Sequence, residues 1–186
     1  LIVANARSNS VSVLLNQGNG SFADQATYDA SNAQSVVVGD LDGDGTLDVV
    51  TAGGHVSVLF NQGDGTFADQ VTLSEGNPYS LAVGDLNGNG TLDLAMASFY
   101  DDNVSVLFNQ GDGTFTDHVA YDVGDEPQSM TVGDLNGDGT LDLATVDVDS
   151  DKAMLLLNHL HWPPLQPTSL YARVADNVGW NTICSD

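Results

Sequence analysis

One acidic phrase of ten residues occurs three times in this chain, at residues 39–48, 84–93 and 133–142. Each copy reads Gly-Asp-Leu, continues with Asp or Asn alternating with glycine, and ends in Thr-Leu-Asp. The copies start 45 and 49 residues apart. Self-similarity at such a period is typical of arrays in which one small unit recurs and packs against its neighbours. We therefore expect tandem copies of one structural unit.

A second phrase alternates with the acidic one and runs Val-Ser-Val-Leu, then Leu or Phe, then Asn-Gln-Gly, starting at Val11, Val56 and Val104. Short runs rich in valine and leucine lie between the phrases, and such runs bounded by Gly, Asn and Asp predict β-strands. The Gly-Asx-Gly tripeptides that close the second phrase predict tight turns. Each repeat is thus expected to hold four antiparallel strands: one before the acidic loop, one after it, one ending in Asn-Gln-Gly, and one after the turn.

The expected fold class is all-β, with tandem four-stranded antiparallel blades that form a partial β-propeller or an open β-repeat array. The array is expected over residues 1–158, in units 1–34, 35–79, 80–128 and 129–158. Leu1–Asn5 aligns with Leu94–Ser98, which follows an acidic loop, so the first unit should lack its opening strand. The pattern stops after Leu157, so the fourth unit should lack its closing strand.

Residues 159–186 form a tail of different composition, in which prolines precede a new apolar run at 169–174. One interpretation is a linker or a cap over the last unit. The other is a donor strand that completes the open edge of a neighbouring copy, because the strands missing at the two ends are complementary. Head-to-tail addition of this kind need not close, so it would give a homo-oligomer or a filament.

The acidic phrases predict metal sites, because they place oxygen ligands on alternating residues of a tight loop. Calcium takes about six to eight oxygen ligands in flexible geometry, which suits such a loop. The carboxylate or amide ligands occupy loop positions one, three, five and nine, and a backbone carbonyl at the threonine fills position seven. The predicted ligands are Asp40, Asp42, Asp44, Thr46 and Asp48; Asp85, Asn87, Asn89, Thr91 and Asp93; and Asp134, Asn136, Asp138, Thr140 and Asp142.

The loops differ in charge, with four carboxylates in the first, three in the third and two in the second. We expect calcium affinity to fall in that order and the first loop to be the least stable without metal. An EF-hand loop begins with the same motif but has a Glu at its twelfth position. The twelfth positions of these three loops hold Thr51, Met96 and Thr145, and the flanking segments are strand-like, so EF-hands are not expected. Magnesium, which prefers rigid octahedral sites, is less suited to these loops.

The overall charge excludes one class of partner. The chain has 26 Asp and Glu against three Lys and Arg, a formal net charge of -23. Nucleic acid binding requires Lys and Arg to neutralise phosphates, so it is not expected.

No apolar run is long enough to span a membrane. The histidines stand in no recognisable nucleophile motif, so no enzyme activity is expected.

The phrase Gly-Asp-Leu-Asx-Gly-Asx-Gly, followed by a Leu-Asp-Leu/Val strand and the Val-Ser-Val-Leu phrase, resembles the FG-GAP and VCBS repeat family over about residues 1–158. The resemblance implies extracellular β-propeller blades of the integrin α type, with Ca²⁺ in the loop that joins the first two strands. It therefore implies about three calcium ions per chain at the positions given above.

Two functions remain open from the sequence. The first is an extracellular calcium-binding structural protein that self-associates head-to-tail into a fibre or matrix. The second is a partial propeller that serves as an adhesion or lectin-like module of a larger secreted protein, with a glycan or protein ligand. Near-identical repeats favour the first, since a specific site usually needs one divergent loop. Weak calcium sites stay filled only where calcium is abundant, which favours an extracellular or cell-surface location.

Overall fold

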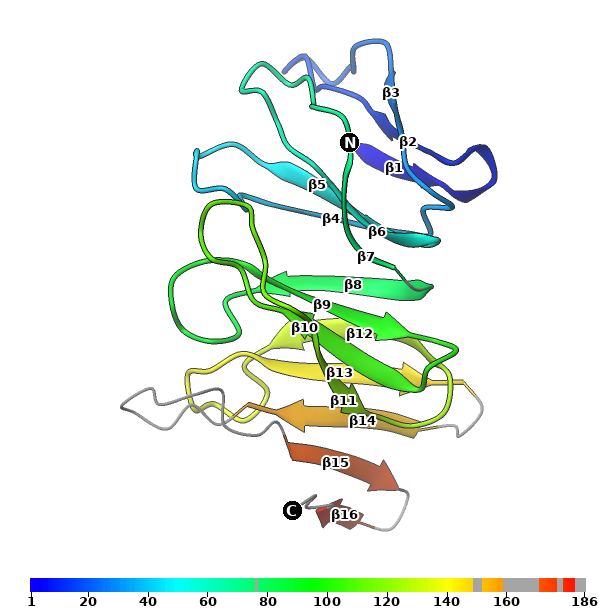
Figure 1. Ribbon diagram of the computed structural model, residues 1–186, viewed down its shortest axis with the longest axis vertical. Coiled ribbons are helices and arrows are strands. Elements are labelled where there is room, and N and C mark those ends of the chain that lie inside the picture. The colour runs from blue at the N-terminus through cyan, green and yellow to red at the C-terminus, as the bar shows by residue number, and fades with distance from the viewer. Residues whose placement is uncertain (76, 149–151, 159–170, 177–178, 183–186) are drawn as a thin grey trace.

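The computed structural model describes residues 1–75, 77–148, 152–158, 171–176 and 179–182 (Figure 1). Four antiparallel sheets follow one another along the chain, and within each sheet the strands pair in sequence order. The described residues contain no α-helix and only one short 3₁₀ segment, η1 (Ala6–Ser8). No described helix is long and apolar enough to cross a membrane. The expected all-β fold of tandem antiparallel units is confirmed.

The strands match the predicted repeat. The first sheet contains β1 (Ile2–Asn5), β2 (Ser10–Val13) and β3 (Ala26–Asp29). The second contains β4 (Ser35–Gly39), β5 (Asp48–Ala52), β6 (His55–Leu59) and β7 (Val71–Glu75). The third contains β8 (Pro78–Gly84), β9 (Asp93–Ser98), β10 (Asn103–Leu107) and β11 (Val119–Asp122). The fourth contains β12 (Pro127–Gly133), β13 (Asp142–Asp147), β14 (Lys152–Leu157), β15 (Tyr171–Asp176) and β16 (Gly179–Thr182).

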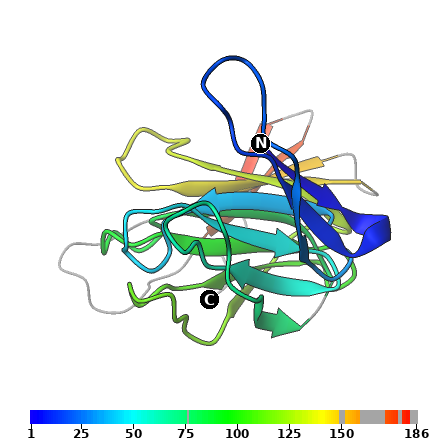
Figure 2. The same ribbon diagram turned by 90° about the horizontal axis from the view of Figure 1, so that it is seen from above.

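The core is divided among the junctions between consecutive sheets. Neighbouring residues of a strand point to opposite faces, so each middle strand serves two junctions. Val49 of β5 packs with the first sheet, whereas Val50 packs with the third. Leu94 and Ala95 of β9 divide in the same way between the second and fourth sheets. Both faces of β5 and β9 are therefore buried, which explains their largely apolar sequences. Seen from above, the consecutive sheets overlap one another (Figure 2).

The junctions repeat the same contacts. The opening strands β4, β8 and β12 lie side by side. The amide of Leu81 donates to Ser35 Oγ at 3.3 Å, and the amide of Met130 donates to Ser80 Oγ at 3.1 Å. A Cβ on Gly39 would lie 2.8 Å from Leu92 Cδ1, and one on Gly84 would lie 2.8 Å from Leu141 Cδ1. Glycine ends β4 and β8 because a leucine of the next unit occupies the space beside each of them.

The two ends of the array differ from each other. The first sheet begins at the second strand of the repeat, as expected, and contains three strands. In the fourth sheet β15 pairs with β14 of the same chain, with Leu157 opposite Tyr171. The expectation that the fourth unit lacks its closing strand is therefore wrong, because the tail supplies a capping strand to the exposed edge of β14. Units three and four also begin two residues earlier than expected, at Pro78 and Pro127.

An asparagine after the third strand links the third unit to the second and the fourth unit to the third. The buried Asn109 Nδ2 donates to Leu41 O of the preceding unit at 2.8 Å and to Leu92 O of its own at 3.1 Å. Asn158 Nδ2 repeats this with Leu86 O at 2.6 Å and Leu141 O at 3.2 Å. The side chain thus joins two consecutive acidic loops.

We expect Asn109→Ala to lower the free energy of unfolding by about 1–3 kcal/mol, because two carbonyl groups lose their buried donor. Urea unfolding measures this change. Asn16→Ala is the matched control: Asn16 holds the same place in the first unit, is exposed, and accepts from Gly18 N within its own turn. The control should change stability by less than about 0.5 kcal/mol. Equal effects of the two substitutions would contradict the inter-unit role.

Candidate metal centre

The first aspartate of each acidic loop organises the loop's amides. Asp40 Oδ1 accepts from Gly43 N at 2.9 Å and Oδ2 accepts from Gly45 N at 3.0 Å. The two glycines have φ of 77° and 87°, a left-handed conformation that lets the chain curl around this carboxylate. Asp85 and Asp134 accept from the corresponding glycine amides of their own loops at 2.7–3.0 Å. All three loops therefore follow the same path.

The last aspartate of each loop is completely buried, although it carries a carboxylate. Asp48 accepts from Leu41 N and from Asn61 N, both at 2.9 Å. Asp93 and Asp142 make the equivalent pairs of bonds, at 2.8–2.9 Å. Each of these carboxylates ties the start of its loop to the end of the third strand. Two backbone donors partly offset the desolvation of the charge.

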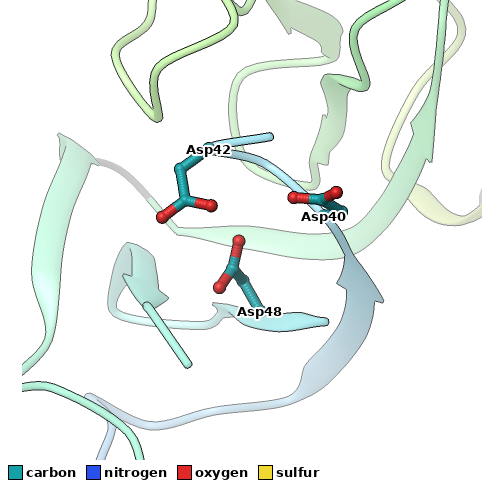
Figure 3. A group of neighbouring side chains, drawn as sticks. All are labelled: Asp40, Asp42 and Asp48. Carbon is teal, nitrogen blue, oxygen red and sulfur yellow. The ribbon is translucent and has the colours of Figure 1, made fainter. Parts of the chain in front are cut away.

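Three carboxylates of the first loop converge. Ligand oxygens of Asp40, Asp42 and Asp48 lie within 4.8 Å of one another. Figure 3 shows the carboxylates of Asp42 and Asp48 directed toward each other, with Asp40 beside them. Like charges this close repel, and the chain's few cations, in η1, β14 and β15, lie outside the acidic loops. Such a set of hard oxygen donors fits a divalent cation such as calcium.

The predicted ligands at positions five and seven have a different arrangement. Asp44 Oδ1 accepts from the amide and the hydroxyl of Thr46, both at 2.7 Å. Both bonds lower the pKa of Asp44, and the bond from the hydroxyl has the larger effect. Asn89 with Thr91 and Asp138 with Thr140 form the same pair of bonds. Asp44 is thus held ionised at the rim of the loop, outside the three-carboxylate group.

In the second and third loops, the described side chains do not bring three carboxylates together. The position-three amides stand in for carboxylates: Asn87 Oδ1 accepts from Asn89 N at 3.0 Å, and Asn136 Oδ1 accepts from Asp138 N at 2.8 Å. Asn136 Nδ2 also donates to Asp138 Oδ2 at 2.9 Å. The loop path is retained while the charge is reduced, which is the basis of the predicted affinity order. That order stays a prediction.

Burial shifts the ionisation of the last aspartates. Desolvation raises the pKa of Asp48, with the charges of Asp42 and Asp44 adding to it, while its backbone bonds act in the opposite direction. Desolvation by burial is the main cause that raises the pKa of Asp93 to about 6. A bound cation would favour the charged form of both groups.

Two groups of residues were not predicted from the sequence. Asn61 and Asn109 belong to the second repeated phrase, and Asn158 follows the equivalent strand of the fourth unit. Their regular position one strand after each loop was the available signal. The other group is an aromatic cluster of Tyr79, Phe99 and Tyr100 at the opposite end of the third sheet. Its signal was a departure from the repeat, since Gly53 and Gly54 follow the equivalent strand in the second unit.

Comparison with known proteins gives a family and a fold. The sequence profile of the FG-GAP-like repeat family matches residues 1–51, 48–96 and 85–145. No curated protein matches the chain. An Agrocybe aegerita lectin that specifically recognises non-reducing terminal N-acetylglucosamine is similar, with a TM-score of 0.56 and 26% identity, over 81% of this chain and 43% of the lectin. BBS1N, solved in complex with ARL6DN, has a TM-score of 0.56 at 14% identity, over 97% of this chain and 59% of that one. The chain thus spans about half the length of these structures, and it shares their propeller-like fold.

In the metal-free protein we expect Asp93 to titrate near pH 6. Its folded pKa lies above the ordinary 3.8, so its contribution to stability is fully present below pH 3.8 and is lost as pH rises through about 6. Carbon-13 NMR of side-chain carboxyl groups measures this, and Asp93→Asn identifies the signal. The exposed Asp64, whose pKa is lowered by Thr66, is the internal reference. A midpoint for Asp93 at or below its ordinary value would contradict the expectation.

Proposed function

The chain belongs to the FG-GAP-like repeat family, and from this premise we propose that it is a calcium-stabilised binding module of the propeller type. The observation that carries the proposal is the convergence of Asp40, Asp42 and Asp48 within 4.8 Å in a loop that recurs three times. We place the module outside the cell and assign it no catalytic activity.

Calcium is the cation that best suits these donors. The first loop would hold it through Asp40, Asp42 and Asp48, with the carbonyl of Thr46 as a further ligand. Asp44 would join them by exchanging its bonds to Thr46 for the ion. The second and third loops would use the corresponding residues with fewer charges. Sites of this kind in extracellular modules have dissociation constants of about 10⁻⁴ to 10⁻³ M, which only an extracellular medium keeps filled.

The role of the ion in this proposal is to hold consecutive units in register. Calcium would relieve the repulsion among the loop carboxylates, and the loop is joined to the next unit through Leu41 O and Asn109. An ordered loop therefore supports an ordered junction. Binding energy of the ion adds to folding stability because the unfolded chain lacks the assembled site.

A binding module is better supported than a fibre. Head-to-tail growth through the tail requires that β15 be available to a neighbouring copy, whereas β15 pairs with β14 of its own chain. The similar Agrocybe aegerita lectin binds a sugar. The fibre remains the alternative, and a calcium-dependent polymer in size-exclusion chromatography would favour it over the module.

The ligand class that we propose is a glycan with terminal N-acetylglucosamine. The supporting feature in this chain is the aromatic cluster. The rings of Tyr79 and Phe99 are stacked with their centroids 4.7 Å apart, and the ring of Tyr100 lies edge-on to Phe99 at a centroid distance of 5.1 Å. Tyr100 is 69% exposed. Exposed rings supply apolar surface with a polar handle, which suits the mixed surface of a sugar. The carboxylates of Asp101 and Asp102 follow directly in the chain and supply hydrogen-bond acceptors.

We expect calcium to raise the melting temperature of the protein and a chelator to reverse the effect. Asp42→Asn keeps the size and one oxygen of the side chain but removes charge, so it should weaken the tightest calcium site by about tenfold. Isothermal titration calorimetry measures this. Asp64→Asn is the matched control, because Asp64 is an exposed turn aspartate of the same unit outside the three-carboxylate group. Absence of calcium binding at millimolar concentration would contradict the proposal.

We expect Tyr100→Ala to reduce binding to N-acetylglucosamine-terminated glycans by about tenfold, because the exposed ring of the cluster is lost. A glycan array followed by calorimetry with the best ligand measures this. Phe22→Ala is the matched control, since Phe22 is a 46% exposed aromatic side chain in the first unit. Equal loss of binding in both variants, or no glycan binding by the unaltered protein, would contradict the assignment of this ligand class.

A further inference from the structure

Asparagine followed directly by glycine occurs four times in the chain, at Asn19, Asn87, Asn89 and Asn136. In such a pair the backbone amide of the glycine can attack the side-chain carbonyl carbon of the asparagine, because glycine has no side chain to obstruct the approach. The attack requires that the amide be available and that the carbonyl oxygen be stabilised as it gains negative charge. The hydrogen bonds around the four pairs separate them by these two requirements.

The carbonyl group of Asn19 is activated by its own turn. Asn19 is exposed and lies between β2 and β3. Its Oδ1 accepts from the amide of Ser21 at 3.0 Å and from the hydroxyl of Ser21 at 2.6 Å. Both donors lie against the oxygen on which negative charge develops when the carbonyl carbon is attacked. The turn therefore stabilises the intermediate of the attack.

The amide of Gly20, which is the attacking group, is available. Among the residues that the structure describes, none accepts a hydrogen bond from it. Gly20 is exposed, and a Cβ built on it would meet nothing within 4 Å. The amide can therefore approach Cγ of Asn19 without first losing a hydrogen bond to the protein.

Asn89, in the second acidic loop, has an equally activated carbonyl group but an occupied amide. Its Oδ1 accepts from the amide of Thr91 at 2.8 Å and from the hydroxyl of Thr91 at 2.6 Å. The amide of Gly90, however, donates to Asp85 Oδ2 at 2.9 Å. Attack would break this charge-assisted bond, and the carboxylate also opposes loss of the amide proton because like charges repel.

The other two pairs have the same protection. The amide of Gly88, which follows Asn87, donates to Asp85 Oδ1 at 2.7 Å. The amide of Gly137, which follows Asn136, donates to the first aspartate of its own loop at 2.7 Å. The first aspartate of a loop therefore holds the amides that would otherwise attack the asparagines of that loop.

We propose that Asn19 is a site of spontaneous deamidation, and that the first aspartate of each acidic loop protects the loop asparagines from the same reaction. The amide nitrogen of Gly20 loses its proton to hydroxide and forms a bond to Cγ of Asn19. The bond between Cγ and Nδ2 breaks, and Nδ2 takes a proton from water and leaves as ammonia. Water then opens the succinimide ring at either carbonyl, which leaves aspartate or isoaspartate at position 19.

The aspartate product is compatible with this turn. Asp64 and Asp112 hold the equivalent position in the second and third units, and each accepts from the amide and the hydroxyl of the threonine two residues further on. Isoaspartate lengthens the backbone by one atom and does not keep this geometry. The inference concerns backbone chemistry and involves neither calcium nor a glycan, so its failure would leave both of those proposals unaffected.

Peptide mapping by mass spectrometry measures deamidation at each asparagine of the full chain after incubation in mildly alkaline buffer without added calcium. We expect Asn19 to react at least about tenfold faster than Asn89, because the two carbonyl groups are activated alike and only the amide of Gly20 is available. Equal rates at the two positions, or a faster reaction at Asn89, overturn the proposal.

Two equivalent turns provide a matched pair of variants away from the ligands of the acidic loops. Asp64→Asn and Asp112→Asn each create an Asn-Gly-Thr turn. The amide of Gly65 has no acceptor among the described parts of the chain, whereas the amide of Gly113 donates to Leu41 O at 3.1 Å. Gly113 is also buried. The two variants therefore differ in the availability of the attacking amide.

We expect the asparagine introduced by Asp64→Asn to deamidate at a rate similar to that of Asn19. The asparagine introduced by Asp112→Asn should react at least about tenfold more slowly, because its attacking amide is held by a carbonyl group. The same peptide mapping measures both rates, and Asn19 in each variant is the internal reference. Equal rates at the two introduced asparagines overturn the proposal, because amide availability would then not control the reaction.

Discussion

The arrangement of the whole array depends on a buried carboxylate that accepts two backbone hydrogen bonds. Asp48, Asp93 and Asp142 are fully buried, and each joins the amide that follows the first loop aspartate to the amide at the end of the third strand. A buried polar group without partners destabilises a fold by several kcal/mol in the least favourable environments, so these bonds are obligatory. They fix the distance between the acidic loop and β6, β10 or β14, and thereby fix the shape of the loop.

This constraint passes from one unit to the next through the asparagine that follows the same strand. The amide nitrogen of Asn109 donates to Asp93, while its side chain donates to Leu41 O of the preceding unit. Asn109 is therefore hydrogen-bonded both to its own loop and to the neighbouring loop. A disturbance in one acidic loop, such as repulsion between Asp40 and Asp42, acts at the same time on the junction. The loops and the packing between sheets are parts of one structural unit.

The sequence predicted the features that depend on local chemistry. Glycine, Asx residues and valine-rich runs determined the turns and strands, so the sheets and the position of each acidic loop were predictable. The pairing of β15 with β14 was not, because it depends on which exposed edge a strand meets in space and not on its own sequence. The bond from Asn109 to the preceding unit was also not predictable, since its partner Leu41 lies 68 residues away in the chain. Within the first loop, the spacing grouped Asp44 with the other acids, but a local bond to Thr46 directs it elsewhere.

The repeated junctions also determine where specificity can arise. Gly39 and Gly84 are confined by leucines of the next unit, and the loop aspartates and asparagines are held by their hydrogen bonds. Residues under such constraints cannot vary without loss of packing, so they cannot distinguish one ligand from another. The turn after β9 contains Phe99 and Tyr100, which replace Gly53 and Gly54 of the preceding unit and pack with Tyr79 of β8. It lies at the end of the strand opposite the acidic loop, so the acidic loop and the aromatic turn of a blade can change independently.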